Sequence, residues 1–363
     1  MSIFGGANAE KEHEGETAHD DAQEPRLRAS RGPARRRSRR LILAGAAAAG
    51  LVAATAPAGP ALAAPGAPAQ TARPAGTSAP AAATGTAPYW TTITLHGHRI
   101  RVHPHGRFGV VPEVGHQALR RQPQAGGNLI YNGGPVAHAP VVYLDFWGRQ
   151  WNSDSNGVSQ YMQSFFGGLG ASGDNWSTIT SQYQDSSGSG PAFGGAVLGG
   201  TWADNGGAAP SSASQGQLAA EAVTAAQHFG VSGDNIDIFV LSPSGTQPDG
   251  FPSTGFCAWH DYTASSSGNI PYTNMPYVLD AGSSCGASSV QGPLDGFSIV
   301  GGHEYAEAIT DPEPSSGWLD SSGSEIGDKC AWQNLSTLNL STGSFAIQPL
   351  WSNRDNGCTL TAP

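Results

Sequence analysis

The segment 300–312 places metal-ligand and general-base side chains at helical spacing. His303 and Glu307 are four residues apart, so a helix would present the imidazole and the carboxylate side by side on one face. Glu304 would stand next to them, where a carboxylate can take a proton from a metal-bound water. The pattern resembles the His-Glu-x-x-His helix of zinc peptidases, with Glu in place of the second His. It predicts His303 and Glu307 as metal ligands and Glu304 as a catalytic base.

A second acidic cluster follows downstream. Glu325 lies 18 residues and Asp328 lies 21 residues after Glu307. In zinc peptidases of the thermolysin type, a glutamate about 20 residues beyond the second histidine supplies the third ligand, and three protein ligands leave one position for water. On a helical turn, Glu325 and Asp328 would face the same side. We therefore predict one or both of them as further metal ligands.

The chemistry of these donors determines which metal they favour. An imidazole with carboxylates suits zinc, but the lack of a second histidine also admits Ca²⁺ or Mn²⁺. The alternative is that His303 caps a buried acidic network that holds no metal. Clustered carboxylates raise one another's pKa, and beyond Gln150 the only basic side chains are Lys329 and Arg354. We therefore predict a divalent cation, zinc first, as the cofactor.

Some aromatic and histidine side chains near the motif could be either functional or structural. His260, in the run Cys257–Tyr262, is a candidate donor to the transition state, and the alternative is a histidine on a surface loop. Tyr305 points away from the ligand face of the helix and is predicted to lie in the core. Trp318 and Trp332 flank the acidic cluster and would either pack in the core or line a substrate cleft. His260 is therefore the second predicted catalytic residue.

The elements that must position these residues follow from apolar periodicity. Strands are predicted at 140–148, 196–202 and 235–241, and helices at 158–169 and 214–229. The segment 176–183 fits a helix or a strand. The motif helix is predicted to begin near Asp295 as its N-cap and to end at Pro312. Because no regular βαβ repeat is visible, the fold class is predicted as α+β: one zincin-like domain over 139–363, with a mixed sheet and the motif helix.

The start of the chain has the composition of an export signal. Arginines within 35–40 lead into the apolar stretch 41–52, and Ala61-Leu62-Ala63 offers a small-x-small cleavage site. Ser38-Arg39-Arg40 at the junction fits the twin-arginine pattern. We therefore predict a twin-arginine-type signal peptide with a long polar lead-in over 1–63, and a secreted mature protein. A membrane anchor is the alternative, but prolines and glycines interrupt the apolar run.

Residues 64–138 are predicted as an Ala/Pro-rich linker or propeptide. Up to residue 89 the composition cannot bury enough apolar surface to fold. The stretch 91–103 alternates like a strand. Four histidines lie in or just after this stretch, and they could bind metal or form a solvated strand face: His96, His98, His103 and His105.

The charge distribution excludes some classes of partner. The chain has a formal net charge of −10, yet residues 1–63 hold nine of the 18 Lys and Arg and seven of the 28 Asp and Glu. The remainder has nine basic and 21 acidic residues, a net of −12. Nucleic acids and anionic membranes are bound through Lys and Arg, so we expect neither as a partner, and no stable membrane insertion after processing.

The four cysteines all lie in the predicted domain. An even number outside the cell favours disulfides. Three pairings are possible, and we predict Cys257–Cys285 and Cys330–Cys358 because each closes a local loop. A four-cysteine zinc site is the alternative, but no Cys-x-x-Cys pair is present.

Several segments, taken in order, resemble plant phosphate-induced proteins of the Exordium type, and most closely their secreted bacterial relatives. The segments are Phe256-Cys257, Gly302 to Glu307, Trp318, Glu325 to Cys330, and Phe345 to Cys358. The resemblance covers roughly residues 139–363. It implies secretion and a cell-wall or extracellular role, and it brings no established catalytic activity. The run Thr310-Asp311-Pro312 departs from the Ser-Asn-Pro-like run of the plant proteins.

These observations favour a secreted metal-dependent hydrolase, most similar to a zinc metallopeptidase, that acts on an extracellular peptide or cell-wall substrate. The alternative is a non-enzymatic, Exordium-like extracellular module with a structural metal. A serine hydrolase is disfavoured because no Gly-x-Ser-x-Gly elbow with a plausible histidine partner occurs. A glycoside hydrolase could use Glu304 or Asp328 in a carboxylate pair, but it would leave His303 without a role.

Overall fold

The computed structural model describes residues 91–95, 98–102, 110–115 and 127–362, all within one compact unit. The predicted signal peptide lies outside these residues, and so do the side chains of the predicted histidine cluster. The strands β1 (Thr91–Leu95) and β2 (His98–Val102) pair antiparallel, so two strands are present where one was predicted.

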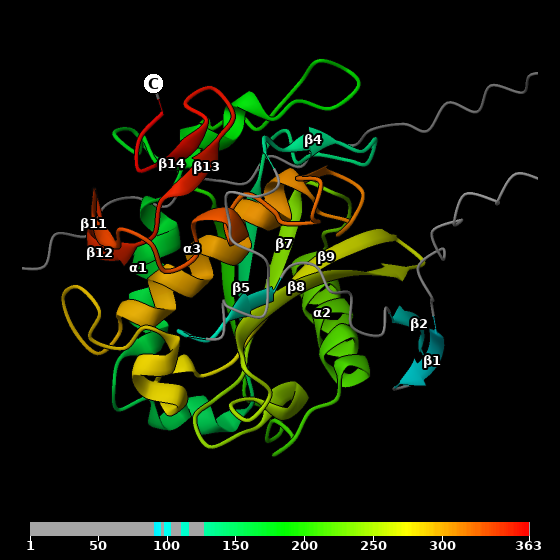
Figure 1. Cartoon of the computed structure of the whole chain (residues 1–363). Helices are drawn as coiled ribbons and strands as arrows, with labels where there is room; N and C mark the ends of the chain where they lie inside the picture. The colour runs from blue at the N-terminus through cyan, green and yellow to red at the C-terminus, as the bar shows by residue number, and fades with distance from the viewer. Residues whose placement is uncertain (1–90, 96–97, 103–109, 116–126, 363) are drawn as a thin grey trace, which may run out of the picture. The chain divides into compact units, whose positions relative to one another are not determined.

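Within the described residues, eight strands form one mixed sheet in the order β1-β2-β8-β9-β7-β5-β6, with β3 also paired to β8 (Figure 1). Neighbours among β6, β5, β7 and β9 run parallel, whereas β8 is antiparallel to β9, β3 and β2. The remaining bounds are β3 Val110–Pro112, β5 Val141–Trp147, β6 Leu198–Asp204, β7 Ile236–Leu241, β8 Phe256–Ser265 and β9 Gly268–Met275. The mixed sheet confirms the α+β prediction.

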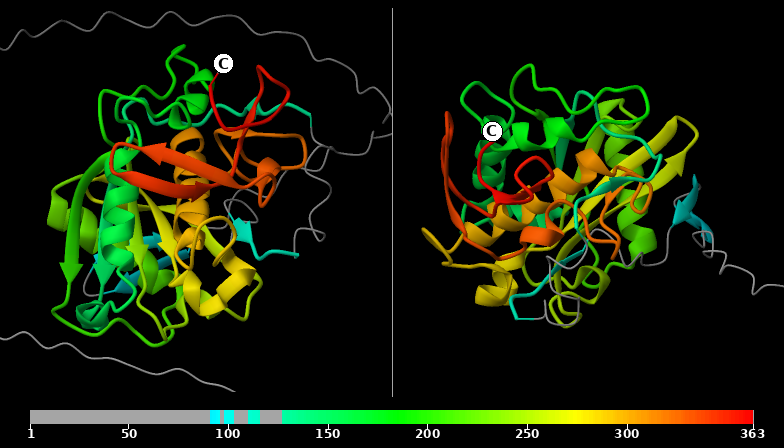
Figure 2. Two further views of the ribbon diagram at one scale, coloured as in Figure 1. Left: turned by 90° about the vertical axis from the view of Figure 1, so that its left-hand side faces the viewer. Right: turned by 45° about the horizontal axis from the view of Figure 1, so that its top comes forward.

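Helices cover both faces of this sheet. The helices α1 (Val158–Gly168) and α3 (Asp295–Thr310) lie on one face, and α2 (Gln215–Phe229) lies on the other (Figures 1 and 2). The first two links of the parallel core, β5-α1-β6 and β6-α2-β7, are βαβ crossovers that the sequence pattern did not indicate.

The predicted helices at 158–169 and 214–229 are confirmed, and local chemistry sets their ends. Ser214 and Gln217 form a capping box at the start of α2, which satisfies amides that have no partner within the helix. Gly230 ends the helix at a φ of 71°, a conformation that glycine adopts without steric cost. The segment 176–183 contains the 3₁₀ helix η3 (Ser177–Gln182).

The start of α3 differs from its prediction. Asp295 is the first residue of the helix and Leu294 is the N-cap. The Asp295 carboxylate accepts hydrogen bonds from the amides of Val290, Gln291 and Gly292, so it stabilises the preceding loop. Periodicity locates a helix, but it does not distinguish a capping carboxylate from one that closes the loop before it.

The motif helix α3 is buried along its whole length, so it has neighbours on every side. A Cβ at Gly302 would come within 2.6 Å of Ile347, and one at Gly301 would lie 3.3 Å from the Met162 side chain. These two glycines therefore let α1 and the hairpin β11–β12 (Ser336–Leu340, Gly343–Ile347) approach closely. The ligand-bearing turn follows directly after this close contact.

Smaller elements complete the domain. Two further strand pairs are β4 with β10 (Ile130–Tyr131, Trp318–Leu319) and β13 with β14 (Leu350–Ser352, Gly357–Thr359). The other 3₁₀ helices are η2 Arg149–Ser153, η4 Pro248–Gly250, η5 Val278–Cys285 and η6 Asp328–Cys330. Both β3 and β4 come from the predicted linker, and both pair with strands of the predicted domain.

Both predicted disulfides are present. Cys257–Cys285 ties β8 to η5, with a Cα–Cα distance of 5.5 Å. Cys330–Cys358 ties η6 to β14, with a Cα–Cα distance of 5.7 Å. These bonds are compatible with an oxidising, extracellular environment.

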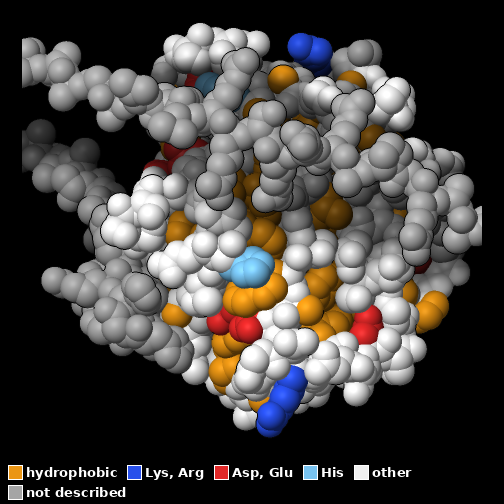
Figure 3. Space-filling model, turned by 180° about the vertical axis from the view of Figure 1, so that it is seen from behind, with side chains coloured by type: hydrophobic (Ala, Val, Ile, Leu, Met, Phe, Trp, Pro, Cys, Tyr) orange, Lys and Arg blue, Asp and Glu red, His pale blue; other side chains and the backbone are white. Residues whose placement is uncertain are grey.

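Charged side chains are sparse on the face shown in Figure 3, where uncharged side chains and backbone predominate. This agrees with the scarcity of Lys and Arg beyond Gln150. Among the described residues, no helix has both the length and the apolar character needed to cross a bilayer.

Candidate metal centre

Helix α3 and strand β8 face each other and supply the centre of the site. His303, Glu304 and Glu307 lie on α3 and are fully buried, and the two glutamates face β8. His260 lies on β8 and is 2 % exposed. The 3.6-residue helical period brings the three α3 side chains to one face, as the spacing predicted.

The donor atoms of this centre form two overlapping groups. The ligand atoms of His303, Glu307 and Asp328 all lie within 4.8 Å of one another. The same holds for His260, Glu304 and Glu307. Both groups are buried and share Glu307, so either could hold a metal ion.

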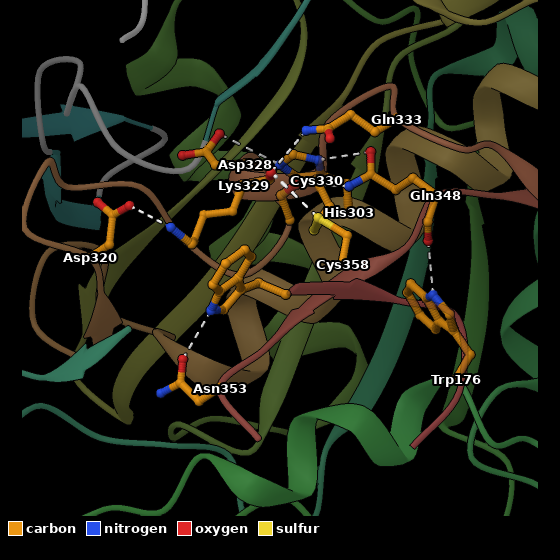
Figure 4. The surroundings of a disulfide bond; sticks show 12 residues. Trp176, His303, Asp320, Asp328, Lys329, Cys330, Gln333, Gln348, Asn353 and Cys358 are labelled. Atoms are coloured by element: carbon orange, nitrogen blue, oxygen red, sulfur yellow. Dashed lines mark hydrogen bonds and ion pairs between the residues drawn. A yellow bond between two sulfur atoms is a disulfide. The ribbon is translucent and has the colours of Figure 1, made fainter. Parts of the chain in front are cut away.

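The orientation of His303 is fixed by Gln348 (Figure 4). The Gln348 amide nitrogen donates to the carbonyl oxygen of Gly327 at 2.9 Å, so its oxygen is the group that faces His303. That oxygen lies 3.3 Å from Nδ1 of His303, which must therefore carry a proton. Nε2 points at Glu307 Oε1 at 2.8 Å and at Asp328 Oδ1 at 3.9 Å, so without a metal it holds a proton against the Glu307 carboxylate, and a metal would take the place of that proton. Metal-ligating histidines are oriented in this way.

The pKa values of His303 and Glu307, both on α3, shift in opposite directions. Burial disfavours the charged form of His303, but the carboxylates of Glu307 and Asp328 outweigh it and raise the pKa of the imidazole. Burial alone would raise the pKa of Glu307, but His303, His260 and the amide of Asp328 together lower it. The Asp328 amide donates to Glu307 Oε1 at 2.9 Å. Glu307 is thus held as a carboxylate, the form that binds a metal.

His260 is a buried strand residue, so the surface-loop alternative is wrong. Its Nδ1 lies 3.1 Å from Glu304 Oε2 and 3.7 Å from Glu307 Oε2. Burial lowers the pKa of His260 to about 4, although Glu307 opposes this shift. His260 is therefore a neutral imidazole next to the predicted catalytic base.

The two downstream acids reach the centre at different points. Asp328 lies beside His303, whereas Glu325 Oε1 is 3.6 Å from Nε2 of His260. The Glu325 amide also donates to Asp328 Oδ2 at 3.3 Å. The sequence predicted that both acids would face one side, and the structure brings both into the centre but beside different histidines.

The nearest basic residue in the sequence points elsewhere. Lys329 directs its Nζ to Asp320 at 2.8 Å and lies over the ring of Trp351 at 4.2 Å (Figure 4). Burial, followed by repulsion from Glu307, raises the pKa of both Glu304 and Glu325 well above the ordinary range. Without a cation these two groups therefore favour their protonated forms, and a bound cation would stabilise the carboxylates instead.

Some polar atoms in the centre lack hydrogen-bond partners among the described residues. They are Oε1 of Glu304, Oε2 of Glu307 and Nε2 of His260. Buried polar atoms in folded proteins are almost always hydrogen-bonded, so such atoms call for a ligand or a proton. Their concentration around Glu307 is the structural sign of an ion-binding centre.

Two residues of the site were missed by sequence reasoning. Gln348 lies between β12 and β13, and no sequence spacing relates it to His303, 45 residues earlier. Asp237 lies on β7, and in the sequence it stands within an apolar strand pattern that does not indicate a site residue. Burial raises its pKa to about 8, with partial offset by the Thr273 hydroxyl, and its charge in turn raises the pKa of Glu304.

The other three side chains named in the sequence analysis pack against neighbouring rings or bind backbone. Tyr305 is fully buried and stacks on Trp176, which confirms its prediction as a core residue. Trp318 contacts the rings of Tyr131 and Tyr183. The indole nitrogen of Trp332 donates to the carbonyl oxygen of Pro112 at 2.7 Å.

No family model, curated protein or solved structure matches this chain. The resemblance to the Exordium type therefore stays a prediction.

Proposed function

We propose that this protein is a secreted metal-dependent hydrolase, most similar in its chemistry to a zinc metallopeptidase. The observation that carries the proposal is the pair of overlapping donor groups around Glu307. One group contains His303, whose Nε2 points at the Glu307 carboxylate at 2.8 Å. The other contains Glu304, the residue that would act as general base. A metal ion and a base would thus stand side by side.

The roles follow from the geometry. His303, Glu307 and Asp328 would hold the metal, and Glu325 would complete the shell from the side of His260. Glu304 would take a proton from water, since it lies with Glu307 and His260 in one group of donor atoms. His260, at 3.1 Å from Glu304, would receive or donate that proton.

Zinc fits this donor set best. Calcium takes about six to eight oxygen ligands, whereas this set offers imidazole nitrogen together with a few carboxylates. Zinc binds imidazole and carboxylate with about four ligands in all, one of them water in catalytic sites.

The test combines metal analysis with two substitutions. His303→Ala should lose the metal and any hydrolysis, whereas Glu304→Gln should keep the metal and lose hydrolysis. His228→Ala, a change at an exposed histidine stacked on Trp202, is the matched control and should change neither. Metal is measured by mass spectrometry of the purified protein, and hydrolysis with casein, a peptide library and cell-wall peptides. Unchanged metal content in His303→Ala would show that the ligands are misassigned.

One observation favours a second candidate, a non-enzymatic extracellular module with a structural metal. His303, Glu304 and Glu307 are all fully buried, so a substrate has no direct access in the full chain. In such a module, Glu304→Gln would bind metal as the wild type does, and neither protein would turn over any substrate.

A further inference from the structure

The strand β3 pairs with the first half of β8, on the side of β8 away from β9 (Figure 1). It runs antiparallel, with Val110 opposite Trp259 and Val111 opposite Ala258. The register shifts by one residue between Val111 and Pro112. This is the way in which a separate extended peptide adds to a sheet edge.

The contact continues past the strand as a narrow slot. The Glu113 amide donates to the carbonyl oxygen of Gly255 at 3.1 Å, and the Val114 amide donates to that of Ser284 at 2.8 Å. Gly255 precedes β8, and Ser284 precedes Cys285 of η5. The disulfide Cys257–Cys285 holds these two walls together. The slot therefore binds the main chain of residues 113–114 through carbonyl oxygens on both of its walls.

A third wall comes from the loop after η6. The indole of Trp332 donates to the Pro112 carbonyl oxygen at 2.7 Å. Trp332 has a φ of 59°, which is uncommon for a bulky side chain and is maintained by the surrounding packing. Its ring also packs close to Gly286, where a Cβ would come within 2.9 Å of it. The indole is thus held in place to bind this peptide carbonyl.

The slot leads to the centre. Val111 is fully buried, and its strand β3 contacts α3, the helix that carries Glu304. Its partner Ala258 is two residues from His260 on β8. A peptide in this slot therefore passes the predicted catalytic base with its main chain.

We propose that the slot binds an extended peptide and that residues 110–114 of this chain occupy it, so that the full chain has its own segment in the substrate position. The proposal rests on the proposed hydrolase function and names its substrate class. Main-chain hydrogen bonds tolerate many sequences, and the buried Val111 side chain would select an apolar residue at one position. The covalent connection makes the segment's binding intramolecular, which raises its effective concentration. Cutting the chain after the segment removes that advantage.

The experiment opens the chain between the segment and the domain. The recognition sequence of a highly specific protease is inserted within residues 116–126 of the exported protein, which is then studied before and after cleavage. Circular dichroism and melting temperature report whether the domain stays folded. Release of the N-terminal fragment is followed by gel filtration. Labelling of His260 and His303 by diethylpyrocarbonate in chelator-treated, metal-free protein, read by mass spectrometry, reports access to the centre without needing any activity.

Cleavage and release should raise labelling of both histidines and any peptide hydrolysis by on the order of tenfold or more. A synthetic peptide of residues 110–115 should reverse both effects, and the same peptide with Val111→Asp should not. Trp332→Phe, which removes the indole N–H, should speed release of the fragment. If the fragment stays bound in the cut chain, Val111→Asp is introduced there to weaken it.

The outcomes separate this proposal from the proposed function. Exposure of the histidines that the peptide reverses, without any hydrolysis, would support the slot and overturn the hydrolase. Equal hydrolysis before and after cleavage would support the hydrolase and overturn the occupied slot. Unfolding of the domain on release, or failure of the peptide to protect the histidines, would show that β3 is a structural strand and overturn the slot.

Discussion

Two clusters of buried acids lie on opposite faces of the same sheet, and they differ in what surrounds them. On the α3 face, carboxylates meet His260 and His303. On the α2 face, Asp145 of β5 meets Glu221 of α2 and is influenced by Asp204, with no imidazole among the groups that shift its pKa. Burial, then Glu221, raises the pKa of Asp145 well above its ordinary value.

The comparison teaches how a protein resolves buried negative charge. Burial, followed by repulsion from Asp204, raises the pKa of Glu221 to about 8, so the α2-face cluster keeps protons at neutral pH. On the α3 face, burial raises the pKa of Glu304 and Glu325 as well, but the imidazoles and an amide lower the pKa of Glu307. Of the described residues, only the α3-face clusters bring three potential ligand residues within metal-binding reach. Acids alone favour a proton, whereas acids with oriented imidazoles favour a metal.

The largest expected effect is metal removal. A chelator should lower the free energy of unfolding by about 4 kcal/mol if the metal is present at about 1,000 times its Kd, because binding stabilises only the folded state. Differential scanning calorimetry with and without EDTA measures it, with Zn²⁺ added back as the control. An unchanged melting temperature would mean that the α3-face cluster holds no metal and does not differ from the α2-face cluster in this respect.

The disulfides should come next. Each bond joins residues 28 apart, so on the loop-entropy model each contributes about 3.5 kcal/mol. Cys330→Ser with Cys358→Ser should also weaken metal binding, because Cys330 ends the 3₁₀ turn that starts at Asp328. Cys257→Ser with Cys285→Ser is a matched control, since its loop has the same length. Urea unfolding and metal titration of both variants provide the comparison; equal losses of metal affinity would mean that η6 does not position a ligand.

A smaller effect is expected at the residue that orients His303. Gln348→Leu removes the acceptor for Nδ1–H, so metal affinity should fall by about 10- to 100-fold, the usual cost of losing such a partner. Gln333→Leu, whose amide binds the Lys329 carbonyl in the same region, is the control and should keep its affinity. Competition with a fluorescent zinc chelator measures both variants. Equal affinity in Gln348→Leu would place the metal on the His260 side.

The last effect concerns the α2-face cluster, and it is small for each single unit of pH. The folded-state pKa of Glu221 is about 8 against an ordinary 4.5, so the folded protein holds the extra proton between these values. The unfolding free energy should therefore fall as pH rises from about 4.5 to about 8, by about 1 kcal/mol per pH unit. Glu221→Gln should flatten this slope, and Gln227→Ala on the exposed side of α2 should not. Urea unfolding at pH 5 and pH 8 tests it; an unchanged slope in Glu221→Gln would mean that another group holds the proton.

The sequence by itself determined much of the site. His303, Glu304 and Glu307 share one face because a helix repeats every 3.6 residues, and that period is a local property of the chain. The disulfide pairs followed from loop closure, and both are present. The strand at 140–148 and the helix at 214–229 were visible because their apolar patterns are regular.

The tertiary structure decided the rest. His260 comes from a strand 44 residues before Glu304, and only the sheet order places β8 against α3. Gln348 and the slot for residues 110–114 likewise depend on pairings between distant segments, which no local period records. The physical reason is that helical spacing is fixed by bonded geometry, whereas contacts across the fold are fixed by which apolar faces bury one another.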